Sequence, residues 1–262
     1  MGAKPSTLEF NILTSGYARA RLAAAEGADF YRGSCADSRP NAAARRAHVY
    51  EAYAYPMDYQ IVLEATCAAA KTRLPKRLLT DVGPVDIVVM YPSADGGMPH
   101  TRPDCLICLP YQVNMPSAET IEHELWHIHQ RYYPAFWATA LKAAWNFESW
   151  TGPTLPRELE DNRRYNPDTI ATPLWCWRDT WVPCPVFKYP SAPDLGSTVT
   201  WFYNVKTGLI SHTVPPDFAA FFGEGQPAAV LEHPYETAAY ILAGGAKASE
   251  AARRLQEYMG TK

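Results

Sequence analysis

The stretch HELWH at residues 123–127 decides how the rest of the chain is interpreted. Residues four apart lie on the same face of a helix, so His123 and His127 can reach one metal ion if this segment is helical. Glu124 lies beside them, where a carboxylate can take a proton from a water at the metal. The spacing therefore predicts a metal site with two imidazole ligands and a general base.

The residues around this stretch predict the helix that the metal site needs. Ser117 is a good N-cap, and Pro134 cannot continue a helix without losing a backbone hydrogen bond, so we expect a helix from about residue 117 to Tyr133. At about 100° per residue, one narrow apolar stripe forms on the side opposite the two histidines. That stripe consists of Ile121, Leu125, Ile128 and Tyr132.

Two segments resemble a known family. HELWHIHQ (123–130) is similar to the active-site helix of the zincin metallopeptidases. HPYETAAY (233–240) resembles the downstream Asn-Pro-x-Glu-x-x-Ala element of gluzincin-like families, although His233 replaces Asn and Tyr240 stands where an Asp often follows. The resemblance implies an α+β, zincin-like fold with a small mixed sheet and a loop-rich C-terminal lobe. It also implies one Zn²⁺ per chain, with Glu236 as the third ligand.

Other third ligands remain open, because a catalytic zinc needs three protein ligands and an open position for water. Glu148 follows the motif at a spacing close to that of thermolysin-like enzymes, but without the trailing Asp of that family. A third histidine of the metzincin kind is not present, since Tyr133 occupies its position, and His129 points elsewhere on the helix. We favour Glu236, with Glu148 as the alternative.

Several side chains are candidates for binding the substrate or stabilising an oxyanion, a role that zincins often give to Tyr or His. The charged run at residues 157–168 is typical of a solvated face, yet it could supply an arginine for a substrate carboxylate. The candidates are Tyr203, Tyr235, Tyr240, His212, Arg163 and Arg164.

The flanking sequence predicts an N-terminal lobe (1–148) and a C-terminal lobe (149–262) that form one catalytic unit. Helical spacing predicts helices over 8–30 and 42–71, the second broken or kinked by Pro56. Strands are predicted over 85–91 and 105–109, joined as a hairpin with the second strand at the sheet edge, where extended peptide substrates pair in zincins. Further predictions are a helix over 135–147, a Pro-rich and aromatic region over 150–230 with a hairpin at 198–203 and 208–213, and helices over 234–243 and 247–259.

Composition narrows the classes of partner. The net charge of −3 and the lack of a Lys/Arg run argue against a nucleic-acid partner. No stretch is apolar enough to span a bilayer, and the N-terminus lacks the order of a signal peptide, so we expect an intracellular (cytoplasmic) protein with reduced, mostly buried cysteines. Residues 1–6 fit the loose pattern for N-myristoylation at Gly2, which by itself would anchor the chain only weakly.

These patterns together predict a zinc metallopeptidase acting on a peptide or protein substrate. Two alternatives stay open: a zinc-stabilised binding or scaffold protein, and a hydrolase of a non-peptide amide. The intact Glu124 favours hydrolysis, because a purely structural zinc site has no use for a base at that position.

Overall fold

The computed structural model describes residues 7–112, 115–246 and 248–260. The chain is of the mixed α+β class and divides into two compact units. The first consists of Met1–Ser34 and Arg45–Tyr132, and the second of Cys35–Ala44 and Tyr133–Lys262. The end of the first unit thus lies at Tyr132, whereas the sequence placed the end of the N-terminal lobe at residue 148.

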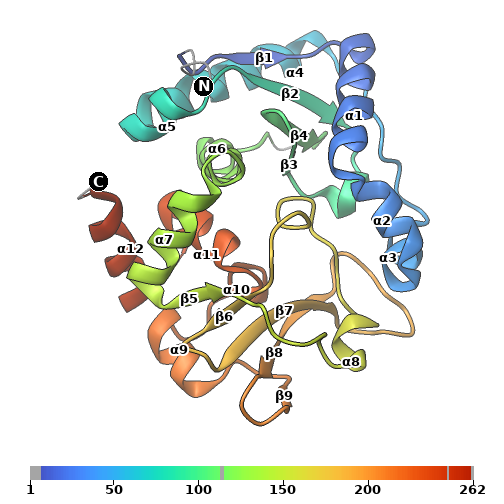
Figure 1. Cartoon of the computed structure of the whole chain (residues 1–262). Coiled ribbons are helices and arrows are strands. Elements are labelled where there is room, and N and C mark those ends of the chain that lie inside the picture. The colour runs from blue at the N-terminus through green and yellow to red at the C-terminus, as the bar shows by residue number, and fades with distance from the viewer. Residues whose placement is uncertain (1–6, 113–114, 247, 261–262) are drawn as a thin grey trace. The chain divides into compact units, whose positions relative to one another are not determined.

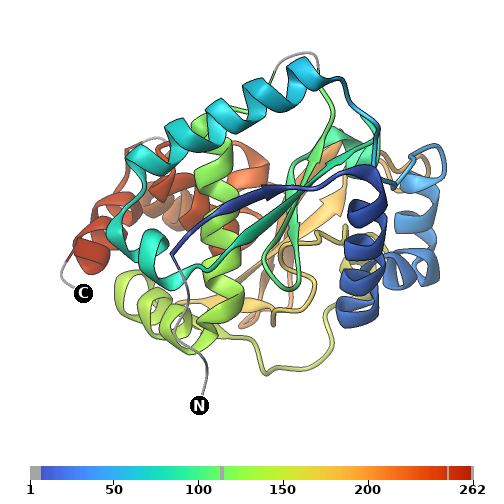
Figure 2. The ribbon, with the colours of Figure 1, turned by 90° about the horizontal axis from the view of Figure 1, so that it is seen from above.

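A small mixed sheet organises the first unit. Its strands are β1 (Phe10–Ile12), β2 (Val85–Met90), β3 (His100–Arg102) and β4 (Leu106–Pro110), in the spatial order β1-β2-β4-β3. β2 pairs in parallel with both β1 and β4, and β3 is antiparallel to β4. Figure 2 shows β1 and β2 running side by side.

The predicted hairpin between residues 85–91 and 105–109 is wrong, because β2 and β4 are parallel neighbours. The connection between them contains a 3₁₀ helix, η1 (Ala94–Gly97), and the additional strand β3. β3 turns back into β4 through Asp104 and Cys105, both with a φ of 60°. β3 therefore occupies the sheet edge that the sequence assigned to β4, and all five residues of β4 are buried, as in an internal strand.

The helices of the first unit differ from prediction at their starts. The helix expected over 8–30 begins only at Ser15, because residues 10–12 pair with β2 instead. The helix expected over 42–71 is broken as Pro56 predicts, but residues 46–56 lie outside any helix. The helices that lie wholly in this unit are α1 (Ser15–Asp29), α4 (Met57–Arg73), α5 (Lys76–Asp81) and α6 (Ala118–Tyr132). The chain passes from the first unit to the second within α2 (Tyr31–Asp37) and returns to the first unit at the end of α3 (Arg39–Arg45).

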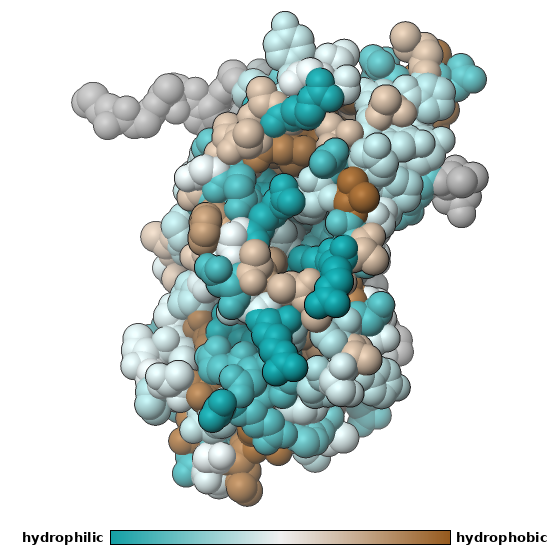
Figure 3. All heavy atoms as spheres, turned by 90° about the vertical axis from the view of Figure 1, so that its right-hand side faces the viewer, coloured by the Kyte–Doolittle hydropathy of each residue, from teal (hydrophilic) through white to brown (hydrophobic). Residues whose placement is uncertain are grey.

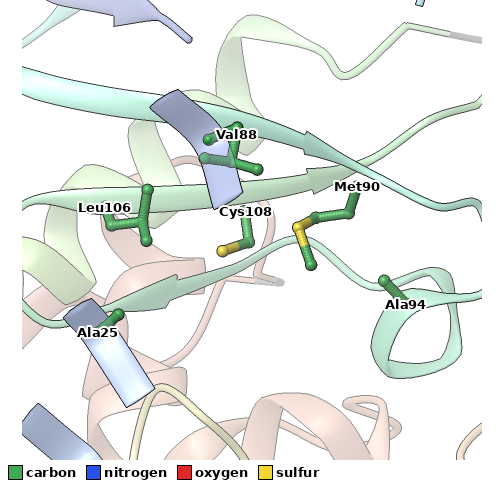
Figure 4. Packing of buried hydrophobic residues seen from close by; sticks show 7 residues of the cluster. Ala25, Val88, Met90, Ala94, Leu106 and Cys108 are labelled. Atoms are coloured by element: carbon green, nitrogen blue, oxygen red, sulfur yellow. The ribbon is translucent and has the colours of Figure 1, made fainter. Parts of the chain in front are cut away.

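The core between α1 and the sheet is built of small and medium-sized side chains. Figure 4 shows side chains from β2 and β4 gathered with alanines from the helical segments. The close approach of α1 to the strands follows from alanine at its buried positions. The buried cluster consists of Ala18, Ala25, Val88, Met90, Ala94, Leu106 and Cys108.

Helix α6 forms as the sequence predicts. The Thr120 backbone N–H donates to Ser117 Oγ at 3.2 Å, which is the expected N-cap hydrogen bond. Ile121, Leu125 and Ile128 are fully buried, and α6 packs against α4, α5 and β3. Tyr132 was predicted in the same stripe, but it is 52% exposed, because it lies in the last turn of the helix.

The second unit contains an antiparallel sheet in the order β5-β6-β7-β8-β9 (Figure 1). Its strands are β5 (Phe147–Ser149), β6 (Trp175–Trp177), β7 (Trp181–Phe187), β8 (Thr198–Asn204) and β9 (Ile210–Ser211). The pairing of β8 with β9 confirms the hairpin that was predicted at residues 198–213. Among the tryptophans on these strands, Trp175 and Trp177 are buried, whereas Trp181 and Trp201 are half-buried.

The helices of the second unit are mostly those predicted, with three short additions. The predicted helix over 135–147 ends at Trp145, because Asn146 has a φ of 58° and starts the turn into β5. The short helices α8, α9 and α10 lie in the region where no helix was predicted. The helices are α7 (Pro134–Trp145), α8 (Arg157–Glu160), α9 (Pro216–Phe222), α10 (Ala228–Leu231), α11 (Pro234–Leu242) and α12 (Glu250–Gly260).

The cysteines agree with the expectation that they are reduced and mostly buried. All six cysteines are free and buried. On the face drawn in Figure 3, apolar residues are scattered among hydrophilic ones. Within the described ranges, no helix combines the length and the apolar character needed to cross a membrane. The predicted acylation site at Gly2 lies outside the described residues.

Candidate metal centre

The two histidines of the motif converge, as their spacing on α6 predicts. His123 Nε2 and His127 Nε2 are 3.0 Å apart, and the two rings meet edge to face with their centroids at 4.7 Å. His127 is 1% exposed and His123 is half-buried. Both ring nitrogens that meet are Nε2 atoms, so each imidazole presents the same atom to one point in space.

A hydrogen bond to Gln130 fixes the tautomer of His127. The ring Nδ1 lies 2.8 Å from Gln130 Oε1, and an amide oxygen can only accept a hydrogen bond. His127 Nδ1 therefore carries the proton, and Nε2 keeps its lone pair. Metal-binding histidines commonly use the second ring nitrogen in this way, which orients the ring and strengthens the ligand.

The geometry of the pair can be tested against a zinc ion. With Zn–N distances of about 2.0–2.1 Å and a tetrahedral angle, two ligating nitrogens lie about 3.3 Å apart. The observed separation of 3.0 Å is close to that value. Two imidazoles on one helix are also the donor type that zinc accepts. The residues present thus fit a zinc ion.

Glu124 lies on α6 next to His123 and is 2% exposed. A carboxylate held away from bulk water on the same helix as two candidate metal ligands is suited to exchange a proton with a water at a metal. The first unit therefore contains two of the predicted ligands and the predicted base on one helix.

Glu236 lies in the first turn of α11 in the second unit and is 5% exposed. The start of this helix explains why His233 can replace the usual Asn of the motif. His233 Nδ1 accepts the backbone N–H of Tyr235 at 3.1 Å, which is the N-cap hydrogen bond that an Asn side chain would accept. Pro234 at the first helical position sets the helical φ and needs no hydrogen-bond partner.

Glu236 accepts a hydrogen bond from the buried Asn166, which belongs to a network with the buried residues Glu232 and Arg164 of the second unit. Asn166 Nδ2 donates to Glu236 Oε1 at 2.7 Å and to Glu232 Oε1 at 2.8 Å. Arg164 Nη1 donates to both carboxylate oxygens of Glu232, at 3.1 and 3.2 Å. Burial raises the pKa of Glu232 above its ordinary value, while the Arg164 cation works in the opposite direction.

Comparison with known proteins gives no relative: no family model, no curated protein and no solved structure matches the chain. The resemblance to zincins thus stays limited to the two short motifs, and the candidate site depends on its own chemistry and geometry.

Glu148, the alternative third ligand, lies on β5 in a different kind of environment. Its carboxylate forms an ion pair with Lys142 Nζ at 2.9 Å, and its side chain is 53% exposed. A catalytic zinc ligand is normally held in a shielded site by further hydrogen bonds. These surroundings favour Glu236 over Glu148.

The candidates for oxyanion or substrate contacts are spread over the second unit. Tyr235 is buried between Trp137 and Trp175, and burial raises its pKa to about 12. His212 is exposed and stacks on Trp201 at 4.1 Å. Tyr240 is half-buried in α11, and Tyr203 packs edge to face on Trp150.

The charged run at residues 157–168 is only partly a solvated face. Its first residues are exposed, but Arg164, Asn166 and Asp168 are buried. Arg164 was one candidate for contact with a substrate carboxylate, and its guanidinium is paired with Glu232 inside the second unit. The sequence had two signals for this network: polar residues alternate at 164, 166 and 168, and Glu232 precedes Glu236 by one helical turn.

Proposed function

We propose that this protein is a zinc-dependent hydrolase of the metallopeptidase class, with a zincin-like fold. The observation that carries the proposal is the convergence of His123 Nε2 and His127 Nε2, 3.0 Å apart, on a helix that also carries the buried Glu124. An amphipathic helix with two ordinary surface histidines has no reason to combine these three features.

We further propose that Glu236 is the third ligand of a single zinc ion. In this proposal His123 and His127 of the first unit and Glu236 of the second unit each contribute one ligand atom. Two histidines and one glutamate are a common ligand set of catalytic zinc sites, which leave a fourth position for water.

A bound zinc ion would supply a Lewis acid that polarises a substrate carbonyl and makes a water more acidic. In our proposal Glu124 takes the proton from that water as general base. It then returns the proton to the leaving nitrogen of the cleaved amide. His123, His127 and Glu236 would hold the ion.

The same residues would serve a hydrolase of a non-peptide amide, and the two imidazoles alone would also suit a zinc-stabilised scaffold. A structural zinc site is closed by a fourth protein ligand and needs no base. The buried Glu124 beside the histidines favours a hydrolase over a scaffold. A peptide library and a panel of simple amides would separate the two hydrolase classes.

Replacing Glu236 by Gln should lower zinc content, whereas Glu148→Gln should leave it at about one ion per chain. A neutral amide is a much poorer zinc ligand than a carboxylate, while Glu148 only loses its exposed pairing with Lys142. Elemental analysis of both variants beside the wild type measures this. Loss of zinc in Glu148→Gln instead would mean that Glu148 on β5, and not Glu236, is the third ligand. Wild-type protein without zinc would contradict the proposed function.

A further inference from the structure

The side chain of Asn166 connects two buried carboxylates in the second unit. Its Nδ2 donates to Glu236 Oε1 and to Glu232 Oε1, at 2.7 and 2.8 Å. Both N–H groups of the amide are therefore used, each on a different carboxylate. Asn166, Glu232 and Glu236 are all at most 7% exposed, so water does not replace these hydrogen bonds easily.

The orientation of this amide is fixed from its other side. The backbone N–H of Asp168 donates to Asn166 Oδ1 at 2.9 Å. Because only the carbonyl oxygen of the side chain can accept this hydrogen bond, the NH₂ group must face the two carboxylates. The turn at residues 166–168 thus sets the direction in which the amide donates. If the amide were flipped, its oxygen would face the two carboxylates and its NH₂ group would face the Asp168 N–H, so these hydrogen bonds would be lost.

Arg164 balances the charge of the second carboxylate. Its ion pair with Glu232 has both side chains at 5% exposure or less. Two buried carboxylates that share the donors of one amide repel each other unless positive charge or hydrogen-bond donors compensate. The Arg164 cation offsets the negative charge of Glu232, and the two Asn166 N–H groups donate to the carboxylates of Glu232 and Glu236.

From this arrangement we infer that Asn166 is a positioning residue for Glu236. It holds Oε1 of Glu236, and so fixes the orientation in which the carboxylate would meet the metal. Glu232 accepts the second N–H of the Asn166 amide, and Arg164 in turn holds Glu232. Arg164 therefore has a positioning role rather than contact with the substrate. The inference rests on the proposed function, since it concerns the ligand Glu236, but each contact that carries it lies within the second unit.

The test is the zinc dissociation constant of the full chain, measured by competition with a chromophoric zinc chelator. Asn166→Ala should weaken zinc binding about 10- to 100-fold, as loss of a residue that orients a ligand typically does. Asn162→Ala is the matched control, because its side-chain amide donates to the Glu158 carbonyl of α8 in the same segment. The zinc affinity of this variant should stay within about twofold of wild type.

A double-mutant cycle separates positioning from general damage. If Asn166 acts through Glu236, Asn166→Ala should have no further effect on the residual zinc affinity of Glu236→Ala. An equal loss in both backgrounds would overturn the inference, as would an Asn166→Ala variant that binds zinc as tightly as Asn162→Ala. Circular dichroism and thermal melting check folding, and Asn166→Ser, which keeps a hydroxyl for the Asp168 N–H, replaces Asn166→Ala if that variant does not fold.

The outcome is distinguishable from failure of the proposed function. If wild-type protein binds no zinc, or His127→Ala binds it as tightly as wild type, the metal centre itself is wrong. If zinc binding depends on His127 but not on Asn166, only the positioning role is wrong.

Discussion

Glu124→Gln should abolish hydrolysis while the protein still binds zinc. The amide has nearly the shape of the carboxylate but cannot take a proton from water, so the general-base step is lost. Removing such a group typically costs about 10²- to 10⁴-fold in rate. Glu124 is 2% exposed, so solvent cannot easily take over its role. The measurement is kcat/KM on a peptide found by library cleavage, together with the zinc content of the same preparation.

Glu119→Gln is the matched control for this prediction. Glu119 lies in the first turn of the same helix, and its exposed side chain pairs with Arg73. The same chemical change there should leave both zinc content and kcat/KM close to wild type, because an exposed ion pair contributes little. Full activity in Glu124→Gln would exclude the general-base role, and loss of zinc in that variant would make Glu124 a ligand instead.

The motif helix could be predicted from sequence because its signals are local. The N-cap at Ser117, the apolar spacing of Ile121, Leu125 and Ile128, and the stop at Pro134 all lie within one segment. Each acts on neighbouring turns of the same helix, so no knowledge of the rest of the chain is needed. The convergence of His123 and His127 follows from the helix alone.

The sheet of the first unit could not be predicted in the same way. The pairing of β1 with β2 joins Phe10 to Val85, and periodicity says nothing about which distant segments pair. Residues 10–12 continue a pattern that also suits a helix, and only the partner strand makes them extended. The three residues of β3 are too few to show an alternation, so the edge strand was assigned to β4.

The surroundings of Glu236 depend on equally distant contacts. Asn166 and Arg164 lie in a run whose charge density is typical of a solvated face, and only their partners in and before α11 bury them. Glu236 itself was recognisable through a motif, but the residues that orient it have no fixed spacing from it. Resemblance can thus suggest a ligand, whereas its supporting contacts require the structure.

Arg102→Met should destabilise the first unit by about 3–5 kcal/mol, the usual result of removing one partner of a buried ion pair. Arg102 is fully buried on β3 and forms a two-pronged contact with Asp29 at the end of α1, at 2.6 and 2.8 Å. It also donates to Glu26 and to the hydroxyl of Tyr50. Methionine fills similar space but leaves the nearly buried carboxylate of Asp29 without its cation.

Arg21→Met provides the comparison that isolates burial as the cause. Arg21 also forms an ion pair within the first unit, with Asp86 at 2.7 Å, but its side chain is 23% exposed and that of Asp86 is 25% exposed. Water can solvate both charges when the pair is broken, so the loss should be about 1 kcal/mol or less. Urea denaturation of the full chain measures both variants. Equal destabilisation by the two substitutions would mean that the contacts of Arg102 do not hold α1 to the edge strand, and that packing of the alanine-rich core does so alone.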